Sequence, residues 1–137
     1  MSDCIFCKIK NNEIHVNKVG ENKHAIAFLD AYPITYGHCL VIPKEHYENL
    51  SSCESQEVLH DVIDLTKAIA DKLKNLNVGI QGFNYLSNEK PIAGQMVMHF
   101  HMHIIPKYDE QTGFKFAAQK PNEDPLLEAK IRSLIIN

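Results

Sequence analysis

Three histidines stand at alternate positions late in the chain, where His99, His101 and His103 are separated by single apolar residues. Alternation of this kind is typical of a β-strand, in which residues two apart share one face. The pattern predicts a strand over 96–105 that carries three imidazoles on one face. The apolar residues between and after the histidines are expected to face the core.

Two chemistries suit such a row of histidines. Zinc can take ligands from an H-x-H strand and activate a bound water molecule. Alternatively, a neutral imidazole can itself attack phosphorus and form a phosphohistidine intermediate. The second chemistry needs a neighbour that fixes the tautomer of the nucleophile, and donors that stabilise the charge on the phosphate.

The loop before the histidines favours the second chemistry. Gly94 allows a ligand to approach the backbone closely, and Asn88 and Gln95 offer amide donors. His38, at the start of another expected strand, could lie beside the row and orient one of its members. These residues together predict a cradle for a phosphate group.

A second group of metal-binding residues begins near the N-terminus, where Cys4 and Cys7 form a C-x-x-C pair. Such a pair can hold zinc, act in redox chemistry or occur by chance. If His99 turns toward the pair and His46 joins it, the four residues form a Cys2His2 set. That set is a closed structural zinc site, which leaves His101 for the chemistry.

The elements that must position these residues follow from the hydrophobic pattern. Apolar residues step by three and four along 58–76 and predict a long amphipathic helix. Ser51 and Glu54 suit a capping box at its start, and Asn77 with Gly79 suit its end. A short helical turn is expected over 4–11, strands over 15–20, 24–30, 38–42 and 80–87, and a last helix from Asp124 and Pro125.

This order of elements predicts an α+β fold with a five-stranded antiparallel meander. A chain of 137 residues is one domain by length, and its net charge of −3 argues against a general nucleic-acid binder. No apolar run approaches the ~20 residues that cross a bilayer. The start of the chain lacks the pattern of a secretory signal. We therefore expect a cytoplasmic protein without nucleic-acid or membrane partners.

The segment Gly94–Pro106, GQMVMHFHMHIIP, resembles the histidine-triad (HIT) superfamily, together with His38–His46 and Asn84–Asn88 upstream. It is most similar to the bacterial HINT-type branch of nucleoside phosphoramidases. The resemblance implies a HIT domain over residues 1–106 and a C-terminal extension over 107–137 that belongs to the same domain. It also implies a homodimer whose two sheets join into one of ten strands.

The resemblance implies roles for individual residues. His101 is the expected nucleophile, His103 lies near the phosphate and the leaving group, and His38 supports the far ring nitrogen of the nucleophile. A structural zinc ion is expected on Cys4, Cys7, His46 and His99. Besides His101 and His103, the pocket for a purine nucleoside monophosphate is expected to include a base slot of Ile5, Phe6, Ile9, Phe28 and Leu29, the ribose-binding Asp30, and the phosphate loop of Asn88, Gly94, Gln95, Met96 and Val97.

Met96 departs from the family pattern, because many relatives have serine there and a thioether donates no hydrogen bond. His103, rather than glutamine, argues against the nucleotidyltransferase branch. The expected function is cleavage of the bond to the α-phosphate of purine nucleoside phosphoramidates or related conjugates, through a nucleotidyl-histidine. The alternatives are a dinucleoside polyphosphate hydrolase and a zinc-stabilised nucleotide-binding module with little turnover.

Overall fold

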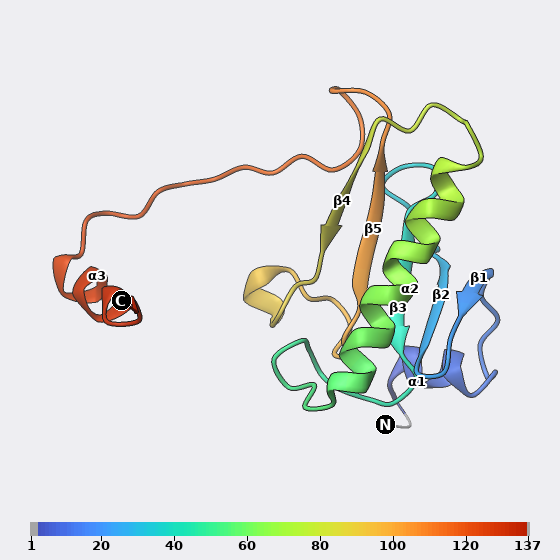
Figure 1. Ribbon diagram of the computed structural model, residues 1–137, viewed down its shortest axis with the longest axis horizontal. Helices are drawn as coiled ribbons and strands as arrows, with labels where there is room; N and C mark the ends of the chain where they lie inside the picture. The colour runs from blue at the N-terminus through green and yellow to red at the C-terminus, as the bar shows by residue number, and fades with distance from the viewer. Residues whose placement is uncertain (1–2, 137) are drawn as a thin grey trace.

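A computed structural model describes residues 3–136; Met1, Ser2 and Asn137, at the ends of the expected domain and extension, lie outside the described residues. Figure 1 shows a twisted sheet, a long helix across one face and an arm that leads away from it. The elements in chain order are α1 (Ile5–Lys10), β1 (Lys18–Glu21), β2 (Ala25–Leu29), β3 (Cys39–Pro43), α2 (Gln56–Lys74), β4 (Gly82–Leu86), a 3-10 turn (Pro91–Ala93), β5 (Met102–Lys107) and α3 (Pro125–Arg132).

The sheet has five strands in the order β1-β2-β3-β5-β4, and all its neighbours are antiparallel. The expected α+β fold is confirmed. The order differs from a strict meander, because β5 lies between β3 and β4. Ile104 and Ile105 of β5 are almost wholly buried, whereas every residue of β4 is at least partly exposed. The more apolar strand therefore takes the interior place, and β4 forms the edge.

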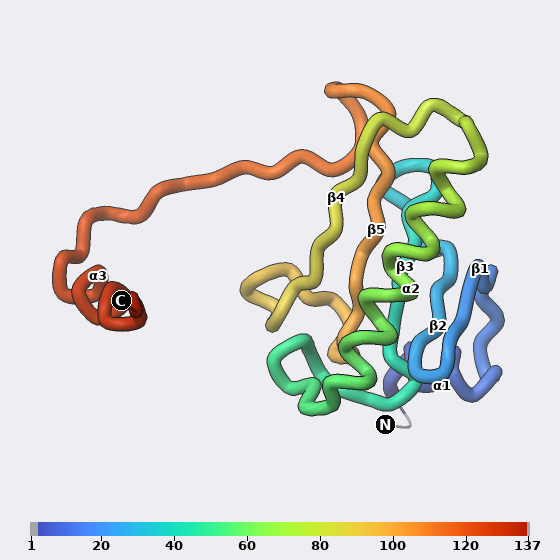
Figure 2. Tube along the Cα trace, in the orientation of Figure 1, coloured from blue at the N-terminus to red at the C-terminus, as the bar shows by residue number. Residues whose placement is uncertain are grey.

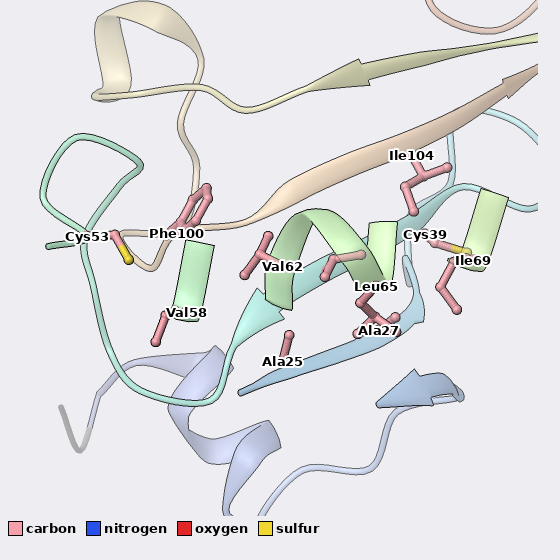
Figure 3. Close-up of a cluster of buried hydrophobic side chains, with 11 residues drawn as sticks. Ala25, Ala27, Cys39, Cys53, Val58, Val62, Leu65, Ile69, Phe100 and Ile104 are labelled. Atoms are coloured by element: carbon pink, nitrogen blue, oxygen red, sulfur yellow. The ribbon is translucent and has the colours of Figure 1, made fainter. Parts of the chain in front are cut away.

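The main core lies between the sheet and α2. Val58, Val62, Leu65 and Ile69 of α2 are buried at helical spacing and pack on this face of the sheet, as Figure 3 shows. Each such side chain contributes roughly 1.5–3 kcal/mol on burial. Small residues on β2 let the helix approach the sheet closely. The other labelled members of this core are Ala25, Ala27, Cys39, Cys53, Phe100 and Ile104.

The start of α2 differs from the sequence prediction. Ser55 caps the helix, because its side chain accepts a hydrogen bond from the N–H of Val58 at 3.3 Å. The capping box expected at Ser51 and Glu54 is wrong. Ser51 instead donates its hydroxyl to Glu89 at 2.6 Å, which ties the turn before α2 to the loop after β4.

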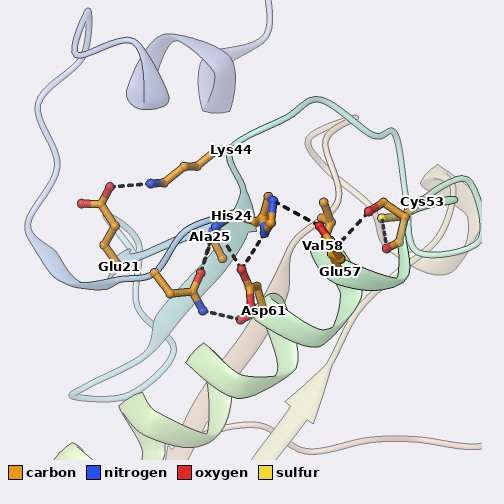
Figure 4. Close-up of polar contacts among 10 residues, drawn as sticks. Glu21, His24, Ala25, Lys44, Cys53, Glu57, Val58 and Asp61 are labelled. Atoms are coloured by element: carbon orange, nitrogen blue, oxygen red, sulfur yellow. Dashed lines mark hydrogen bonds and ion pairs between the residues drawn. The ribbon is translucent and has the colours of Figure 1, made fainter.

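The β1–β2 turn is held against α2 through Asp61. His24 Nδ1 donates to the carboxylate of Asp61 at 2.7 Å, and the amide of Asn22 donates to the main-chain oxygen of Asp61 at 2.8 Å. On the other side of the hairpin, Lys44 pairs with Glu21 at 2.7 Å. Figure 4 shows these contacts, which fix the hairpin between the helix and the end of β3.

The strand that carries the histidines begins later than expected. β5 starts at Met102, and the ladder with β3 runs only from Cys39–Ile104 to Val41–Met102. Pro43 lacks the N–H that would continue the ladder. The expected alternation nevertheless holds, because Phe100 joins the core under α2 while His101 packs against Phe6 on the opposite face.

The second face of the sheet is covered in part by α1. Phe6 and Ile9 of this short helix pack on a layer of buried apolar side chains from β2 and β3. The layer consists of Ile26, Phe28, Leu40 and Ile42. This face carries the triad histidines, so α1 is the element that closes the site from one side.

The chain beyond Gly113, here called the arm, leads away from the sheet to α3, as the trace in Figure 2 shows. Asp124 caps α3 as expected, since its carboxylate accepts a hydrogen bond from Leu127 N–H at 3.1 Å. α3 buries none of its side chains. Within residues 3–136, no helix is both long and apolar enough to span a membrane.

Candidate functional site

The ring of His101 is held in one tautomer. Its Nδ1–H donates to the main-chain oxygen of His99 at 2.7 Å, and a carbonyl oxygen can only accept. The neutral ring therefore keeps its proton on Nδ1 and a lone pair on Nε2. Burial lowers the pKa of His101 below its ordinary value, so the ring stays neutral at physiological pH. A neutral imidazole with a free Nε2 lone pair is the form that a nucleophile requires.

His38 and His103 form a second fixed pair. The N–H of Ile34 donates to His38 Nδ1 at 3.1 Å, so the neutral ring carries its proton on Nε2. His38 Nε2 lies 3.0 Å from His103 Nδ1 and donates to it. The proton of His103 is therefore on Nε2, which makes this nitrogen a hydrogen-bond donor. Burial first, and then the neighbouring His101 and His38, lower the pKa of His103 to about 4.

This pairing corrects the role expected for His38. The β3–β5 register places Leu40 opposite His103, so His38, two residues before Leu40, extends away from His101. His38 consequently orients the third histidine of the row. The carbonyl of His99 takes the supporting role that the resemblance implied for His38.

Asp30 completes this group, with its carboxylate 3.5 Å from His38 Nε2. Asp30, His38 and His103 bring three ligand atoms close enough to hold a metal ion. The N–H of Ile34 argues against that use, because it keeps the proton of His38 on the nitrogen that a metal would need. The group is better described as a chain of hydrogen bonds that sets the tautomer of His103.

Cys4, Cys7, His46 and His99 form a separate cluster, here called the Cys2His2 cluster. His46 Nδ1 and His99 Nδ1 are 3.2 Å apart, and the sulfur–nitrogen distances are 3.3 Å for Cys7–His46, 3.4 Å for Cys4–His99 and 3.6 Å for Cys7–His99. Tetrahedral zinc requires about 3.3 Å between nitrogens and about 3.6 Å between nitrogen and sulfur. His99 Nε2–H also donates to the carbonyl of Pro43 at 2.9 Å, which leaves Nδ1 free to bind a metal. The donor set fits zinc.

The expected base slot is in part core. Phe6 and Phe28 are buried and meet edge to face, with ring centroids 5.8 Å apart, and Phe6 also packs edge-on against His101 at 5.2 Å. Ile5 keeps substantial exposed surface. Leu29 shares the strand face of Ala25 and Ala27 and lines a cavity with Ile69 on the α2 side of the sheet, so the expectation that its side chain lines the base slot is wrong. The structure thus brings Phe6 to His101 and Phe28 to Phe6, and leaves Ile5 open to solvent.

Gln95 does not present its amide as the sequence predicts. The side chain is buried; its NH2 donates to the carbonyls of Glu48 and Val97, and its oxygen accepts from Lys90 N–H at 2.7 Å. The loop has no strand partner to satisfy these main-chain groups, and the amide does so instead. Gln95 therefore braces the loop, and its side chain is not available to a phosphate in this structure.

The rest of the loop is more open. Gly94 has a φ of +105°, and a Cβ there would lie 3.1 Å from the amide nitrogen of Asn88, which donates to the carbonyl of Gly94. Met96 is 89% exposed, and Val97 packs against the layer under α1. The loop requires glycine at position 94 for its backbone conformation and for the close approach of Asn88.

Two contributors were missed by the sequence reasoning. Ser87 donates its hydroxyl to the carbonyl of His101 at 2.7 Å, and the N–H of Phe100 donates to the carbonyl of Tyr47 at 2.6 Å. These contacts fix the main chain around His101. Ser87 lies in the segment that carries the resemblance and could have been singled out, whereas no sequence signal identifies a main-chain donor or acceptor.

The fold and the two fixed histidines, His101 and His103, define a small α+β protein of the histidine-triad class. The HIT domain family model matches residues 11–110. The chain is 51% identical over 127 residues to an uncharacterised HIT-like protein of Mycoplasma genitalium, covering 93% of this chain and 89% of that one. It is 40% identical over 125 residues to the adenosine 5'-monophosphoramidase of Saccharomyces cerevisiae, covering 90% and 75%.

Solved structures agree with this match. A HIT family protein from Bacillus anthracis has a TM-score of 0.83 at 38% identity, over 96% of this chain and 94% of that one. A histidine triad nucleotide-binding protein from Candida albicans has a TM-score of 0.82 at 35% identity, over 96% and 94%. The chain belongs to the HIT domain family.

Proposed function

We propose that this protein is a nucleotide hydrolase that cleaves purine nucleoside phosphoramidates through a nucleotide bound covalently to His101. The observation that carries the proposal is the bond from His101 Nδ1–H to the His99 carbonyl, which leaves Nε2 free to attack. Similarity to adenosine 5'-monophosphoramidases at about 40% identity supports the same reaction class.

The reaction has two steps. His101 Nε2 attacks the α-phosphorus, a P–Nε2 bond forms, and the P–N bond to the leaving amine breaks as the amine takes up a proton from solvent water. Water then attacks the phosphorus and gives its proton to solvent, the P–Nε2 bond breaks, and the nucleoside monophosphate and free His101 are released. The His99 carbonyl stabilises the positive ring of the intermediate, and His103 Nε2–H donates to a phosphate oxygen as charge develops there.

The substrate would lie between α1 and the loop of Gly94. The exposed side of Ile5 offers apolar contact for a purine base, and Asp30 is positioned at the end of β2 to accept hydrogen bonds from ribose hydroxyls. The N–H groups of Gly94 and Gln95 are bonded within the loop, so the main-chain N–H groups of Met96 and Val97 are the donors proposed for the phosphate in place of the Gln95 side chain.

The Cys2His2 cluster is proposed to hold a structural zinc ion. Four protein ligands leave no open coordination position, so the metal would stabilise the fold and would not activate water. The protein is also proposed to be a homodimer. β4 forms an open sheet edge, and Tyr85 on β4 and Ile63 on α2 keep apolar surface exposed. Pairing of two β4 edges would give the ten-stranded sheet, and sedimentation equilibrium tests it.

A comparison of substrates tests the function. We expect kcat/KM to be higher for an adenosine phosphoramidate than for a diadenosine polyphosphate, because the contacts proposed at Ile5 and Asp30 serve one nucleoside. Mass spectrometry of acid-quenched enzyme should find the nucleotidyl adduct on the peptide that contains His101. A ratio in favour of the diadenosine compound would assign the alternative hydrolase, and binding without turnover would assign a nucleotide-binding module.

A further inference from the structure

His99 takes part in both the Cys2His2 cluster and the triad. Its Nδ1 lies 3.4 Å from Cys4 Sγ and 3.6 Å from Cys7 Sγ, whereas its main-chain oxygen accepts the Nδ1–H of His101 at 2.7 Å. The residue is fully buried, and its Nε2–H is held by Pro43. The carbonyl shares a planar peptide unit with the N–H of Phe100, which donates to Tyr47, so it offers the His101 ring an acceptor of fixed direction.

Phe6 provides a second connection between the same two groups. It lies between the two cysteines in α1, and its ring packs edge-on against His101 with centroids 5.2 Å apart. α1 has six residues and is held by the burial of Phe6 and Ile9. Cys4 caps this helix, since its sulfur accepts the N–H of Cys7. The cysteines therefore determine where the Phe6 ring lies against the nucleophile.

The main chain near His101 is anchored, but its ring depends on these two contacts. His101 precedes β5 and lies outside the strand ladder. The N–H of Phe100 donates to the carbonyl of Tyr47, and the carbonyl of His101 accepts from the hydroxyl of Ser87. These two bonds fix the backbone. The orientation of the ring itself follows from the carbonyl on one side and the aromatic edge on the other.

His103 is held in a different way. It lies within β5, opposite Leu40 on β3 and Leu86 on β4, and its ring is bonded to His38. None of these contacts involves a residue of the Cys2His2 cluster. The His103 ring lies 5.0 Å from the His101 ring, so its chemical shifts respond to that ring, but its tautomer is set by His38 and serves as an internal reference.

We propose that the Cys2His2 cluster is a positioning device for the nucleophile. Zinc bound there would hold α1 and with it the Phe6 ring, which keeps the His101 ring on the His99 carbonyl. Loss of the metal would release the His101 ring while His103 stays in place. The inference rests on the proposed function for the role of His101. A displacement of about 1 Å at a reacting group costs up to ~100-fold in rate, so the effect falls on kcat.

The test observes the imidazoles directly. Protein labelled with 15N-histidine is prepared with zinc and after removal of zinc by a chelator, and NMR reports the tautomer of each ring. We expect a single Nδ1–H tautomer for His101 with zinc and a mixture without it, while His38 and His103 keep their tautomers. The kcat should fall roughly tenfold to a hundredfold with KM changed less than about threefold, and added zinc should restore both measurements. Identical His101 signals in the two preparations would overturn the proposal.

A substitution removes one connection and leaves the metal in place. Phe6→Leu, with zinc bound, should give partial tautomer mixing at His101 and an unchanged tautomer at His103. Phe116→Leu is the matched control, because Phe116 lies in the arm and is 81% exposed, and it should change neither. If the zinc-free protein unfolds, the Phe6→Leu protein decides, and His101 signals equal to those of the wild type refute the proposal. Expected NMR changes in a protein that cleaves no nucleotide would contradict the proposed function alone.

Discussion

At the residue scale, His101 and His103 differ in which ring nitrogen carries the proton. His101 has its proton fixed on Nδ1 by a carbonyl, and His103 has its proton fixed on Nε2 because His38 donates to Nδ1. One ring therefore offers a lone pair and the other offers a hydrogen. Both rings are predominantly neutral at physiological pH, because burial lowers both pKa values.

Replacement of the two histidines should separate their roles. We expect His101→Ala to abolish turnover while nucleotide affinity stays within about tenfold, because the nucleophile acts mainly in the transition state. His103→Ala should cost about 2–4 kcal/mol in kcat/KM through the loss of one donor. Steady-state kinetics and equilibrium binding measure both effects. A His101→Ala protein that keeps more than about a tenth of wild-type kcat would favour a different mechanism.

The pKa of His103 gives a prediction about pH. NMR titration should place its midpoint near 4, below the ordinary value of 6.5. In the unfolded chain the same ring takes up a proton near 6.5, so the unfolded state binds more protons between these two values. The contribution of His103 to the free energy of unfolding therefore falls as the pH is lowered from about 6.5 to about 4. A midpoint near 6.5 would show that the ring is not buried as described.

At the scale of elements, the site is assembled by short irregular segments that rigid elements hold in place. α1 covers one side, the loop between β4 and β5 covers another, and the triad itself straddles the start of β5. The main chain of the loop is fixed by the buried amide of Gln95. Such segments place main-chain donors and acceptors at the site, which a regular strand would have used in its ladder.

Two glycines with positive φ allow the loop to be tested against a control. Gly94→Ala should lower stability by roughly 1–3 kcal/mol and should also lower kcat/KM, because its Cβ would displace Asn88, 3.1 Å away. Gly79→Ala has a similar φ of +96° but meets no atom within 4 Å. It should lower stability alone. Urea unfolding and kinetics on both proteins measure this, and equal kinetic effects would contradict it.

At the scale of the whole molecule, α2 and α1 cover opposite faces of one sheet, and the two faces have different roles. The face under α2 holds the larger apolar core. The opposite face combines a smaller apolar layer with the triad and joins the Cys2His2 cluster through Phe6. The arm adds length without adding to either core, because α3 buries no side chain.

The zinc content depends on the whole molecule, because the four ligands of the Cys2His2 cluster come from three distant parts of the chain. Elemental analysis of protein purified without chelator should find one zinc ion per chain. His46→Ala should lose it, whereas His60→Ala, at an exposed position on α2, should keep it. Zinc should also be released as the pH falls, because the ligands must be deprotonated. The absence of zinc from the wild-type protein would refute the assignment.

The sequence by itself determined the features that depend on residues close together along the chain, such as which side chains face the core and where a helix lies. The alternation around Phe100 set which residues face the core, the helical period set the buried face of α2, and Asp124 with Pro125 set the start of α3. These patterns are local, because side-chain direction follows from the period of the element. Residues 58 to 76 show the limit of this reasoning, since the period located the helix but the cap at Ser55 was misplaced.

Only the tertiary structure decided which groups meet. The N–H of Ile34 sets the tautomer of His38, the carbonyl of His99 sets that of His101, and the Gln95 side chain turns inward. The place of β5 between β3 and β4 also belongs here. Main-chain donors and acceptors are the same at nearly every residue, so a sequence cannot tell which of them a buried ring will face. That choice follows from strand register and loop packing, and it determines which nitrogen is free to react.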